Sequence, residues 1–325
     1  MTTADVLIVG AGPAGLSAAL VLGRARRSVV VVDLGRPRNA AAGSMQGFLS
    51  RDGTPPTELL AIGREEVARY GVELRDGEVV GLHHDGDVLV ATLADGDRLT
   101  ARRVLVATGL GDALPSVDGV AERWGRDVLH CPYCHGYEVR DRPVAVLGRG
   151  DVSVHYAQVV RQWSSDVVLL RHRLAPPGPR EQEELAARDI RVVDGEVARL
   201  VVEDDRLAGA RLVDGTLVRF EVLFVGAATG TRLHDALLRD VGAQFWDGPV
   251  TDVPEVDATG RTSVPGVWVA GNVADPTAQV VVAAGQGYAA GVALNSDLLD
   301  DDVAAAVAAY RVSRGATGAQ VTPTR

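Results

Sequence analysis

The chain has 325 residues, enough for about two domains, and 46% of them are hydrophobic, enough to fill a core in each. Its formal net charge of −10 argues against a nucleic-acid backbone as the main partner. All 33 basic residues are arginine, and the lack of lysine excludes Schiff-base catalysis and a phosphate loop of the lysine type.

The first segment, MTTADVLIVGAG, enters an apolar strand at once and leaves no room for a signal peptide. No apolar run approaches the roughly 18 residues that a membrane-spanning helix needs. We therefore expect a cytoplasmic protein with no membrane partner. In that compartment a Cys-x-x-Cys pair is more often catalytic than structural.

Residues 5–33 match a dinucleotide-binding unit. DVLIVG predicts a buried parallel strand, GAGPAG a glycine-rich turn, LSAALVLGRAR a helix and SVVVVD a second strand. The turn and the helix N-terminus favour a pyrophosphate, and the acid that ends the second strand favours ribose hydroxyls. The candidate binding residues are Gly10, Gly12, Pro13, Ala14, Gly15 and Asp33.

Residues 72–109 alternate in polarity and turn at Asp-Gly pairs, which predicts β-hairpins. The strand VLVATG ends this region at Thr108 and Gly109. The following LGDALPSVDGV is rich in proline and glycine and predicts a linker.

The stretch HCPYCHGYE at residues 130–138 holds Cys131 and Cys134, the only cysteines of the chain. Four interpretations compete: a zinc half-site, a glutaredoxin motif, a structural disulfide and a redox pair. Adjoining ligands would strain a tetrahedral zinc site, and there is no second Cys-x-x-Cys, so we expect no metal. A glutaredoxin would carry the motif after the first strand of a small fold. We favour the redox pair.

A two-residue spacing closes a disulfide readily across the first turn of a helix, where the dipole also lowers a thiol pKa. Pro132 suits that first turn. His135 can exchange a proton near neutral pH and is the candidate acid or base, with local hydrogen bonding as the alternative. His130 and Glu138 are weaker candidates for the same task.

Residues 142–170 repeat the strand–turn–helix–strand pattern, but the turn of this second unit departs from the glycine motif. Arg149 places a large side chain inside it, and Ser153 replaces the third glycine. Arg171 and Arg173 follow the second strand and suit either a 2′-phosphate or solvent. Whether this unit binds NADPH stays open, and we expect a weakened site.

Residues 195–225 have the character of a β-meander, and TGTRLHDALLRDVGAQFWDG resembles a return crossing. The segment VPGVWVAGNVADPTAQVVVAAGQGYAAGVALNSDL then predicts a strand, a turn and a long helix of small residues. Its place after the second unit suggests that it closes the first domain, which would make that domain discontinuous.

Together, GAGPAG, ATG, LPSVDG, the Cys-x-x-Cys and GVWVAGNVADPTAQVVVAAGQGYAAG resemble, in this order and over roughly residues 4–300, the low-molecular-weight thioredoxin reductases. The resemblance implies an α/β fold of two Rossmann-like, three-layer ββα domains, a homodimer, and rotation between the domains. It places FAD in a discontinuous domain at residues 1–117 and 232–325. The central domain, at residues 118–231, would be NAD(P)H-binding-like and would carry the redox pair.

Carried over by position, the glycine-rich turn and Asp33 would bind the ADP half of FAD, with Thr108 and Gly109 alongside. Asn272 stands where the family has an aspartate that bonds the ribityl chain. Gln279 and Val280 would line the flavin ring, although Ala278 replaces an arginine. Cys134 would face the flavin and Cys131 would meet the substrate.

His135 stands where the reductases have an aspartate, and the form C-x-x-C-H-G-Y-E resembles FAD-dependent dithiol oxidases that close disulfides in natural products such as holomycin and gliotoxin. This resemblance implies oxidation of a small-molecule dithiol by O₂, with H₂O₂ as product. The alternatives are an NADPH-dependent reductase of a thioredoxin-like protein and a non-enzymatic flavoprotein redox sensor.

Overall fold

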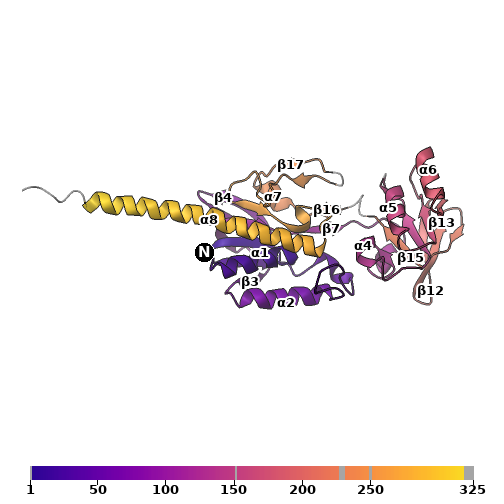
Figure 1. Ribbon diagram of the computed structural model, residues 1–325, viewed down its shortest axis with the longest axis horizontal. Coiled ribbons are helices and arrows are strands. Elements are labelled where there is room, and N and C mark those ends of the chain that lie inside the picture. The colour runs from indigo at the N-terminus through magenta and orange to yellow at the C-terminus, as the bar shows by residue number, and fades with distance from the viewer. Residues whose placement is uncertain (1, 151, 227–230, 249–250, 318–325) are drawn as a thin grey trace, which may run out of the picture.

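A computed structural model describes residues 2–150, 152–226, 231–248 and 251–317 (Figure 1). The chain forms two units, each built on its own sheet, that lie along the long axis of the molecule. The larger sheet has the strand order β3-β2-β1-β6-β5-β4, with β19 paired to β6. Its strands are β1 (Thr2–Val9), β2 (Val29–Asp33), β3 (Glu73–Asp76), β4 (Val79–Asp85), β5 (Val88–Leu93), β6 (Arg98–Val106) and β19 (Val267–Val269).

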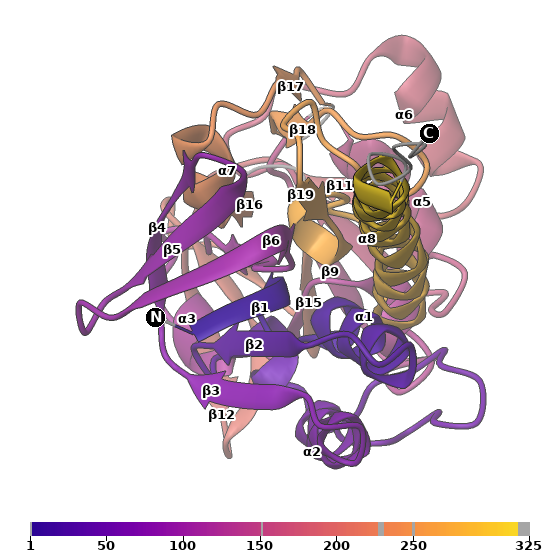
Figure 2. The same ribbon diagram turned by 90° about the vertical axis from the view of Figure 1, so that its left-hand side faces the viewer.

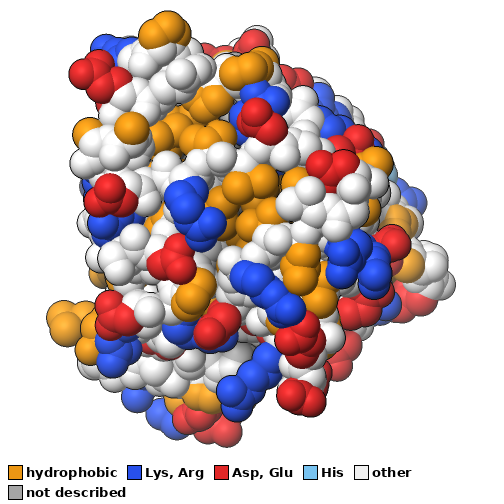
Figure 3. Space-filling view, turned by 90° about the vertical axis from the view of Figure 1, so that its right-hand side faces the viewer, with side chains coloured by type: hydrophobic (Ala, Val, Ile, Leu, Met, Phe, Trp, Pro, Cys, Tyr) orange, Lys and Arg blue, Asp and Glu red, His pale blue; other side chains and the backbone are white. Residues whose placement is uncertain are grey.

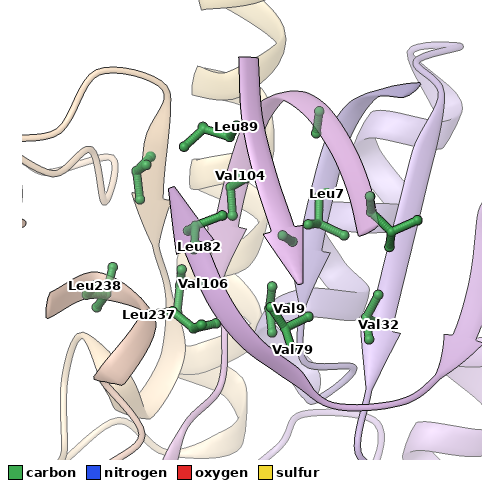
Figure 4. Packing of buried hydrophobic residues seen from close by; sticks show 14 of the residues in the cluster. Leu7, Val9, Val32, Val79, Leu82, Leu89, Val104, Val106, Leu237 and Leu238 are labelled. Atoms are coloured by element: carbon green, nitrogen blue, oxygen red, sulfur yellow. The ribbon is translucent and has the colours of Figure 1, made fainter. Parts of the chain in front are cut away.

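Three layers make up this larger unit (Figure 2). Along β1, Val6 and Ile8 point into one core and Leu7 and Val9 into the other, as the period of a strand requires. The first core contains side chains of α1 (Pro13–Arg24), α2 (Pro56–Ala68) and α8 (Val280–Thr317). The second lies against the β4–β5 hairpin and α7 (Ala236–Asp240), where Leu82, Leu89 and Leu238 close over the sheet (Figure 4).

Helices α1 and α8 pack closely because small residues face each other. Gly287 and Gly291 of α8 lie against Ala14 and Ala18 of α1. The first half of α8 therefore belongs to the core of the larger unit, whereas residues 303–314 are exposed and project away from it (Figure 1).

The smaller unit contains a parallel sheet of order β11-β10-β9-β15-β8. Its strands are β8 (Val128–Leu129), β9 (Val144–Leu147), β10 (Val167–Leu170), β11 (Ile190–Val193) and β15 (Val222–Val225). All of them except the edge strand β11 are buried and apolar, which fits the prediction of a second βαβ unit. The helices α5 (Ser153–Val160) and α6 (Pro179–Ala186) flank it, and the predicted meander is present as β12 (Val197–Glu203), β13 (Arg206–Leu212) and β14 (Leu217–Val218).

The chain crosses between the units twice. The first crossing starts with β7 (Leu110–Asp112), which pairs antiparallel with β16 (Thr231–Leu233) of the second crossing. The predicted linker thus begins as a strand. Strand β19 then returns to the larger sheet beside β6, so the first unit is discontinuous, and the α/β fold of two Rossmann-like units is confirmed.

The remaining short elements are η1 (Arg38–Ala41), α3 (Val120–Arg123), α4 (Pro132–His135), β17 (Phe245–Trp246), β18 (Val253–Pro254) and η2 (Gly271–Val273). Among the described residues, no helix combines the length and the apolar character needed to cross a bilayer. At the end of the molecule formed by the smaller unit, acidic, basic and apolar side chains are interspersed, and no broad basic face appears there (Figure 3).

Candidate active site

The cysteine pair lies at the start of α4, on the side of the smaller unit that faces the larger one (Figure 1). Cys131 and Cys134 form a disulfide with their Cα atoms 5.2 Å apart. Cys131 is the N-cap, its Sγ accepts the N–H of Cys134 at 3.1 Å, and Pro132 is the first helical residue. The expected first-turn geometry is therefore present. Cys131 is 9% exposed, and Cys134 is more open.

Gln279, a residue of the larger unit, contacts this disulfide. Its Oε1 lies 3.1 Å from Cys134 Sγ, and its Nε2 lies 3.6 Å from Cys131 Sγ. Gln279 directly precedes α8 and is 145 residues beyond Cys134 in the sequence. The resemblance implies that Gln279 lines the flavin ring, and the same residue contacts both sulfurs, so the pair lies beside the position that the resemblance implies for the flavin.

Two histidines flank the pair. Burial lowers the pKa of His135, while the nearby Glu138 carboxylate acts in the opposite direction. Burial also lowers the pKa of His130, to about 4, and the Arg38 guanidinium adds to this effect. Both imidazoles are therefore neutral at pH 7, a form that can accept a proton.

Arg38 and Asp112 form a bidentate ion pair, at 2.8 and 2.5 Å, between η1 and β7. Sequence reasoning missed this pair, because its members are 74 residues apart and stand in no motif. Asp112 also lines a small pocket at the junction of the units, together with Trp124, His130 and Arg149.

The first glycine-rich turn fits a dinucleotide. Gly10 has a φ of +106°, and a Cβ there would lie 2.4 Å from the Ala107 carbonyl oxygen. A Cβ on Gly15 would lie 1.9 Å from the Gly10 carbonyl oxygen, so the helix can approach the strand only with glycine. Gly12 has no atom within 4 Å of its Cβ position, which leaves open space for a pyrophosphate at the N-terminus of α1. Pro13 and Ala14 open that helix.

Asp33 ends β2 beside this turn, as the ribose-binding acid of such a unit should. Its Oδ1 accepts the N–H of Ala11 at 2.8 Å, and Oδ2 pairs with the Arg64 guanidinium of α2. Arg64 was not among the predicted site residues. It occupies an ordinary helical position, and only the fold brings it to Asp33.

The other predicted FAD residues lie at the ends of β6 and β19. Thr108 donates its hydroxyl to the His234 carbonyl at 2.6 Å, and Gly109 accepts the His234 N–H at 3.1 Å. Asn272 donates Nδ2 to the carbonyls of Asp275 and Ala278, and Val280 begins α8. The fold thus gathers these residues and the glycine-rich turn around one face of the larger unit.

In the second glycine-rich turn, a hydroxyl of the turn itself occupies the backbone amides, and we call this turn closed. Ser153 is 5% exposed, and its Oγ accepts the backbone N–H groups of Arg149 at 3.0 Å and of Gly150 at 3.2 Å. The Arg149 side chain donates to the Ala113 carbonyl of the first crossing at 3.1 Å. Two amides that would hold a phosphate are therefore already paired.

The two arginines beyond β10 have acidic partners. Arg171 pairs with Asp194 at 2.7 Å and Arg173 with Glu196 at 2.5 Å. The Arg173 side chain is exposed, and an exposed pair contributes little energy, so this contact alone does not prevent binding of a 2′-phosphate. The Arg171 side chain is only 17% exposed. Across the described residues, no three His, Cys, Asp or Glu side chains gather as metal ligands would.

Known proteins match this chain over most of its length. Residues 4–287 match the family of pyridine nucleotide-disulphide oxidoreductases. The chain is 31% identical to Thioredoxin reductase sirT of Leptosphaeria maculans, over 93% of this chain and 96% of that protein. It is also 31% identical to the Thioredoxin reductase of Streptomyces coelicolor, over 89% of this chain and 92% of that protein.

Solved structures agree with these matches. The crystal structure of HlmI is 49% identical, with a TM-score of 0.91, covering 96% of this chain and 99% of that one. The Putative Thioredoxin Reductase TrxB from Bacillus anthracis is 30% identical, with a TM-score of 0.86, covering 92% of this chain and 99% of that one. Such relatives imply that this chain binds FAD, in agreement with the open first turn. The chain therefore belongs to the pyridine nucleotide-disulphide oxidoreductase family, as a thioredoxin reductase-like, flavin-dependent thiol/disulfide oxidoreductase.

Proposed function

We propose that the protein is an FAD-dependent dithiol oxidase, which converts a small-molecule dithiol to its intramolecular disulfide through Cys131 and Cys134 and yields H₂O₂ from O₂. The observation that carries the choice of oxidase is the closed second glycine-rich turn. A thioredoxin reductase needs a pyridine nucleotide as its electron source, and this turn is where the nucleotide would bind.

The closed turn opposes nucleotide binding in two ways. A pyrophosphate would have to displace the Ser153 hydroxyl from the Arg149 and Gly150 amides, because an amide N–H cannot serve both acceptors well. It would also meet the Arg149 side chain, which is held against the Ala113 carbonyl. We therefore propose that the electrons come from the thiol substrate itself.

In the proposed reaction His135, neutral at pH 7, takes the proton of the first substrate thiol. The resulting thiolate attacks Cys131, the Cys131–Cys134 bond breaks, and Cys134 leaves as a thiolate. The second substrate thiol then attacks the substrate sulfur of the mixed disulfide, the bond from that sulfur to Cys131 breaks, and the proton of the second thiol passes to the leaving Cys131. The products are the substrate disulfide and a reduced cysteine pair.

FAD, which Asp33 and the first glycine-rich turn would hold, would supply the redox chemistry that carries the electron pair from the reduced cysteines to O₂. The sum is one dithiol plus O₂ to one disulfide plus H₂O₂. The protein's own contribution is to hold the disulfide beside the flavin through Gln279 and to manage the thiol protons through His135. Cys131 is only 9% exposed, which favours a small thiol over the surface of a protein substrate.

Anaerobic mixing of the purified, FAD-loaded protein tests this proposal. A small vicinal dithiol should bleach the flavin absorbance quickly, whereas NADPH and NADH should bleach it slowly or not at all. Admission of air should restore the colour and produce H₂O₂ in proportion.

Thioredoxin reductase is the second candidate, favoured by the names of the relatives. Fast stoichiometric bleaching by NADPH, with reduction of a thioredoxin, would assign that activity instead. Arg171 and Arg173 would then be the 2′-phosphate ligands, and changing both to alanine should raise KM for NADPH far more than for NADH. No bleaching by either reductant would favour the redox sensor.

The remaining features belong to the same proposal. We place the FAD-binding domain at residues 1–117 and 232–325 and the central domain at residues 118–231, with support from the β7–β16 pair near both divisions. We also propose a cytoplasmic homodimer. Size-exclusion chromatography with light scattering would test the dimer.

A further inference from the structure

We propose that the Gln279 side chain is the hydrogen-bond donor that stabilises the Cys134 thiolate, and that Asn272 is a positioning residue that holds Gln279 in place. The inference rests on the redox role of the cysteine pair in the proposed function, but not on which substrate or electron acceptor is used.

The geometry of the oxidised pair carries the first part. The Gln279 amide spans the disulfide, with Oε1 3.1 Å from Cys134 Sγ and Nε2 3.6 Å from Cys131 Sγ. A disulfide sulfur has no hydrogen, so the short contact to Cys134 is not a hydrogen bond in this state. Only the amide can donate here, and it donates weakly to Cys131.

Reduction changes what Cys134 can accept. When a thiolate attacks Cys131, the electron pair of the broken S–S bond remains on Cys134, which becomes a charged acceptor. Rotation of the amide about its soft terminal torsion exchanges Oε1 for Nε2. An N–H donor then lies about where Oε1 now lies, at hydrogen-bonding distance from the new thiolate.

Asn272 explains why Gln279 is held at this place. Its Nδ2 donates to the Asp275 carbonyl at 3.1 Å and to the Ala278 carbonyl at 2.9 Å, which closes the loop just before Gln279. The neighbouring Gly271 N–H is held by Gln286 Oε1 at 2.9 Å. A carboxylate at position 272 has no donor and could make neither loop bond.

The consequence is a Cys134 thiol that ionises at lower pH. A hydrogen bond to a charged group shifts a pKa by about one unit or more. The titratable groups around the pair in the described part of the chain include His130, which directly precedes Cys131, and His135 and Glu138, which lie on or just after α4. They are unchanged in the variants below, so they do not account for differences between them.

The test uses a Cys131→Ser background, in which Cys134 is the single thiol. The pH dependence of its alkylation by iodoacetamide gives the thiol pKa, and the long-wavelength absorbance of the FAD-loaded protein gives a second titration of the same thiolate. Gln279→Leu should raise the pKa by about one unit. Gln279→Glu should raise it further, because a carboxylate repels the thiolate.

Asn272→Asp should shift the pKa in the same direction as Gln279→Leu, by a smaller amount. The control is Gln182→Leu on α6, whose amide bonds the Pro177 carbonyl and should leave the pKa unchanged. FAD content and the unfolding midpoint show whether each variant is folded.

An unchanged pKa in folded Gln279→Leu and Gln279→Glu overturns the proposal. Because alkylation needs neither substrate nor O₂, its outcome is independent of the oxidase assignment. If the wild-type protein fails to oxidise dithiols while the Gln279 variants show a raised Cys134 pKa, only the proposed function is refuted.

Discussion

His130 and His135 lie one residue outside the cysteine pair on either side, yet different neighbours set their proton affinities. The Arg38 guanidinium adds to the burial of His130, whereas the Glu138 carboxylate partly offsets the burial of His135. In our proposal His135, which directly follows Cys134, therefore serves as the base for the incoming thiol.

We predict that His135→Ala lowers turnover by roughly 10²–10⁴-fold, the range typical of an acid–base group. A base works when neutral, so the wild-type rate should fall as pH drops through the lowered pKa of His135, and the variant should lose this acidic limb. Glu138→Gln removes the charge that raises this pKa and should move the limb to lower pH. Steady-state rates from pH 5 to 9 measure both, and a near-normal rate in His135→Ala would assign the proton to another group.

His130 should make stability depend on pH. Its pKa falls from an ordinary 6.5 to about 4 in the folded protein, so below pH 6.5 the unfolded chain binds the proton more readily. The free energy of unfolding is therefore highest above pH 6.5, and this histidine lowers it by up to about 3 kcal/mol as pH falls to 4. Urea unfolding at pH 7 and pH 5 should show a smaller pH effect in His130→Asn than in wild type. His84→Asn on exposed β4 serves as the control and should keep the wild-type difference.

The two cysteines should differ when changed singly. Cys131→Ser should leave a Cys134 thiolate against oxidised flavin, with a long-wavelength charge-transfer band, and Cys134→Ser should lack this band. Both should lose turnover, because neither can form the disulfide. Absorbance spectra and oxidase assays check the two statements, and wild-type activity in both variants would mean that the disulfide is structural.

The sequence was sufficient to find the cysteine pair, since the only two cysteines stand at helical first-turn spacing. It could not give the contact of Gln279 with both sulfurs, because that contact joins segments 145 residues apart across two units. Likewise, the replacement of a glycine by Ser153 was visible in the sequence, but the direction of its hydroxyl was not.

The two glycine-rich turns show how elements with the same pattern diverge. Both follow a buried strand and precede a helix, so local apolar spacing predicts both correctly. In the first turn Gly12 leaves open space at the helix N-terminus, whereas in the second the Ser153 hydroxyl occupies the amides. The second turn thus differs from the first by the Ser153 hydroxyl on its amides and by the Arg149 side chain, which donates to the Ala113 carbonyl.

We predict that Ser153→Gly increases the affinity for NADPH, because it frees the Arg149 and Gly150 amides and restores the third glycine. Titration of the flavin or protein fluorescence with NADPH measures this dissociation constant. Ser153→Thr keeps the hydroxyl and should behave like the wild type. An equal affinity in Ser153→Gly and wild type would mean that the serine does not block the site.

On the scale of the whole molecule, the C-terminal pattern of strand, turn and small-residue helix was the signal for a discontinuous first unit. The prediction from this pattern is correct because small residues of α8 pack against small residues of α1, so the two helices lie in one core. The pairing of β7 with β16 had no such signal, since each is a three-residue strand within an irregular segment.

We predict that residues 113–230 can be replaced by an Asn-Gly turn that joins Asp112 to Thr231. These two residues are paired partners, so their Cα atoms lie only about 5 Å apart and a two-residue hairpin turn can connect them. The shortened protein should fold and retain FAD, measured by flavin absorbance and thermal unfolding, and should lack dithiol oxidation. A colourless or unfolded product would show that the larger unit depends on the smaller one.

The β7–β16 pair also bears on how such a protein can arise. An insertion that enters and leaves the larger unit at two residues paired with each other leaves the path of the surrounding chain almost uninterrupted. A single recombination event in a flavin-binding ancestor is therefore enough to add, remove or exchange the smaller unit with its cysteine pair. The core of the larger unit needs no compensating substitutions. The same arrangement would let protein engineers graft a foreign thiol module at Asp112 and Thr231 and so redirect the electrons of one flavin to a new substrate.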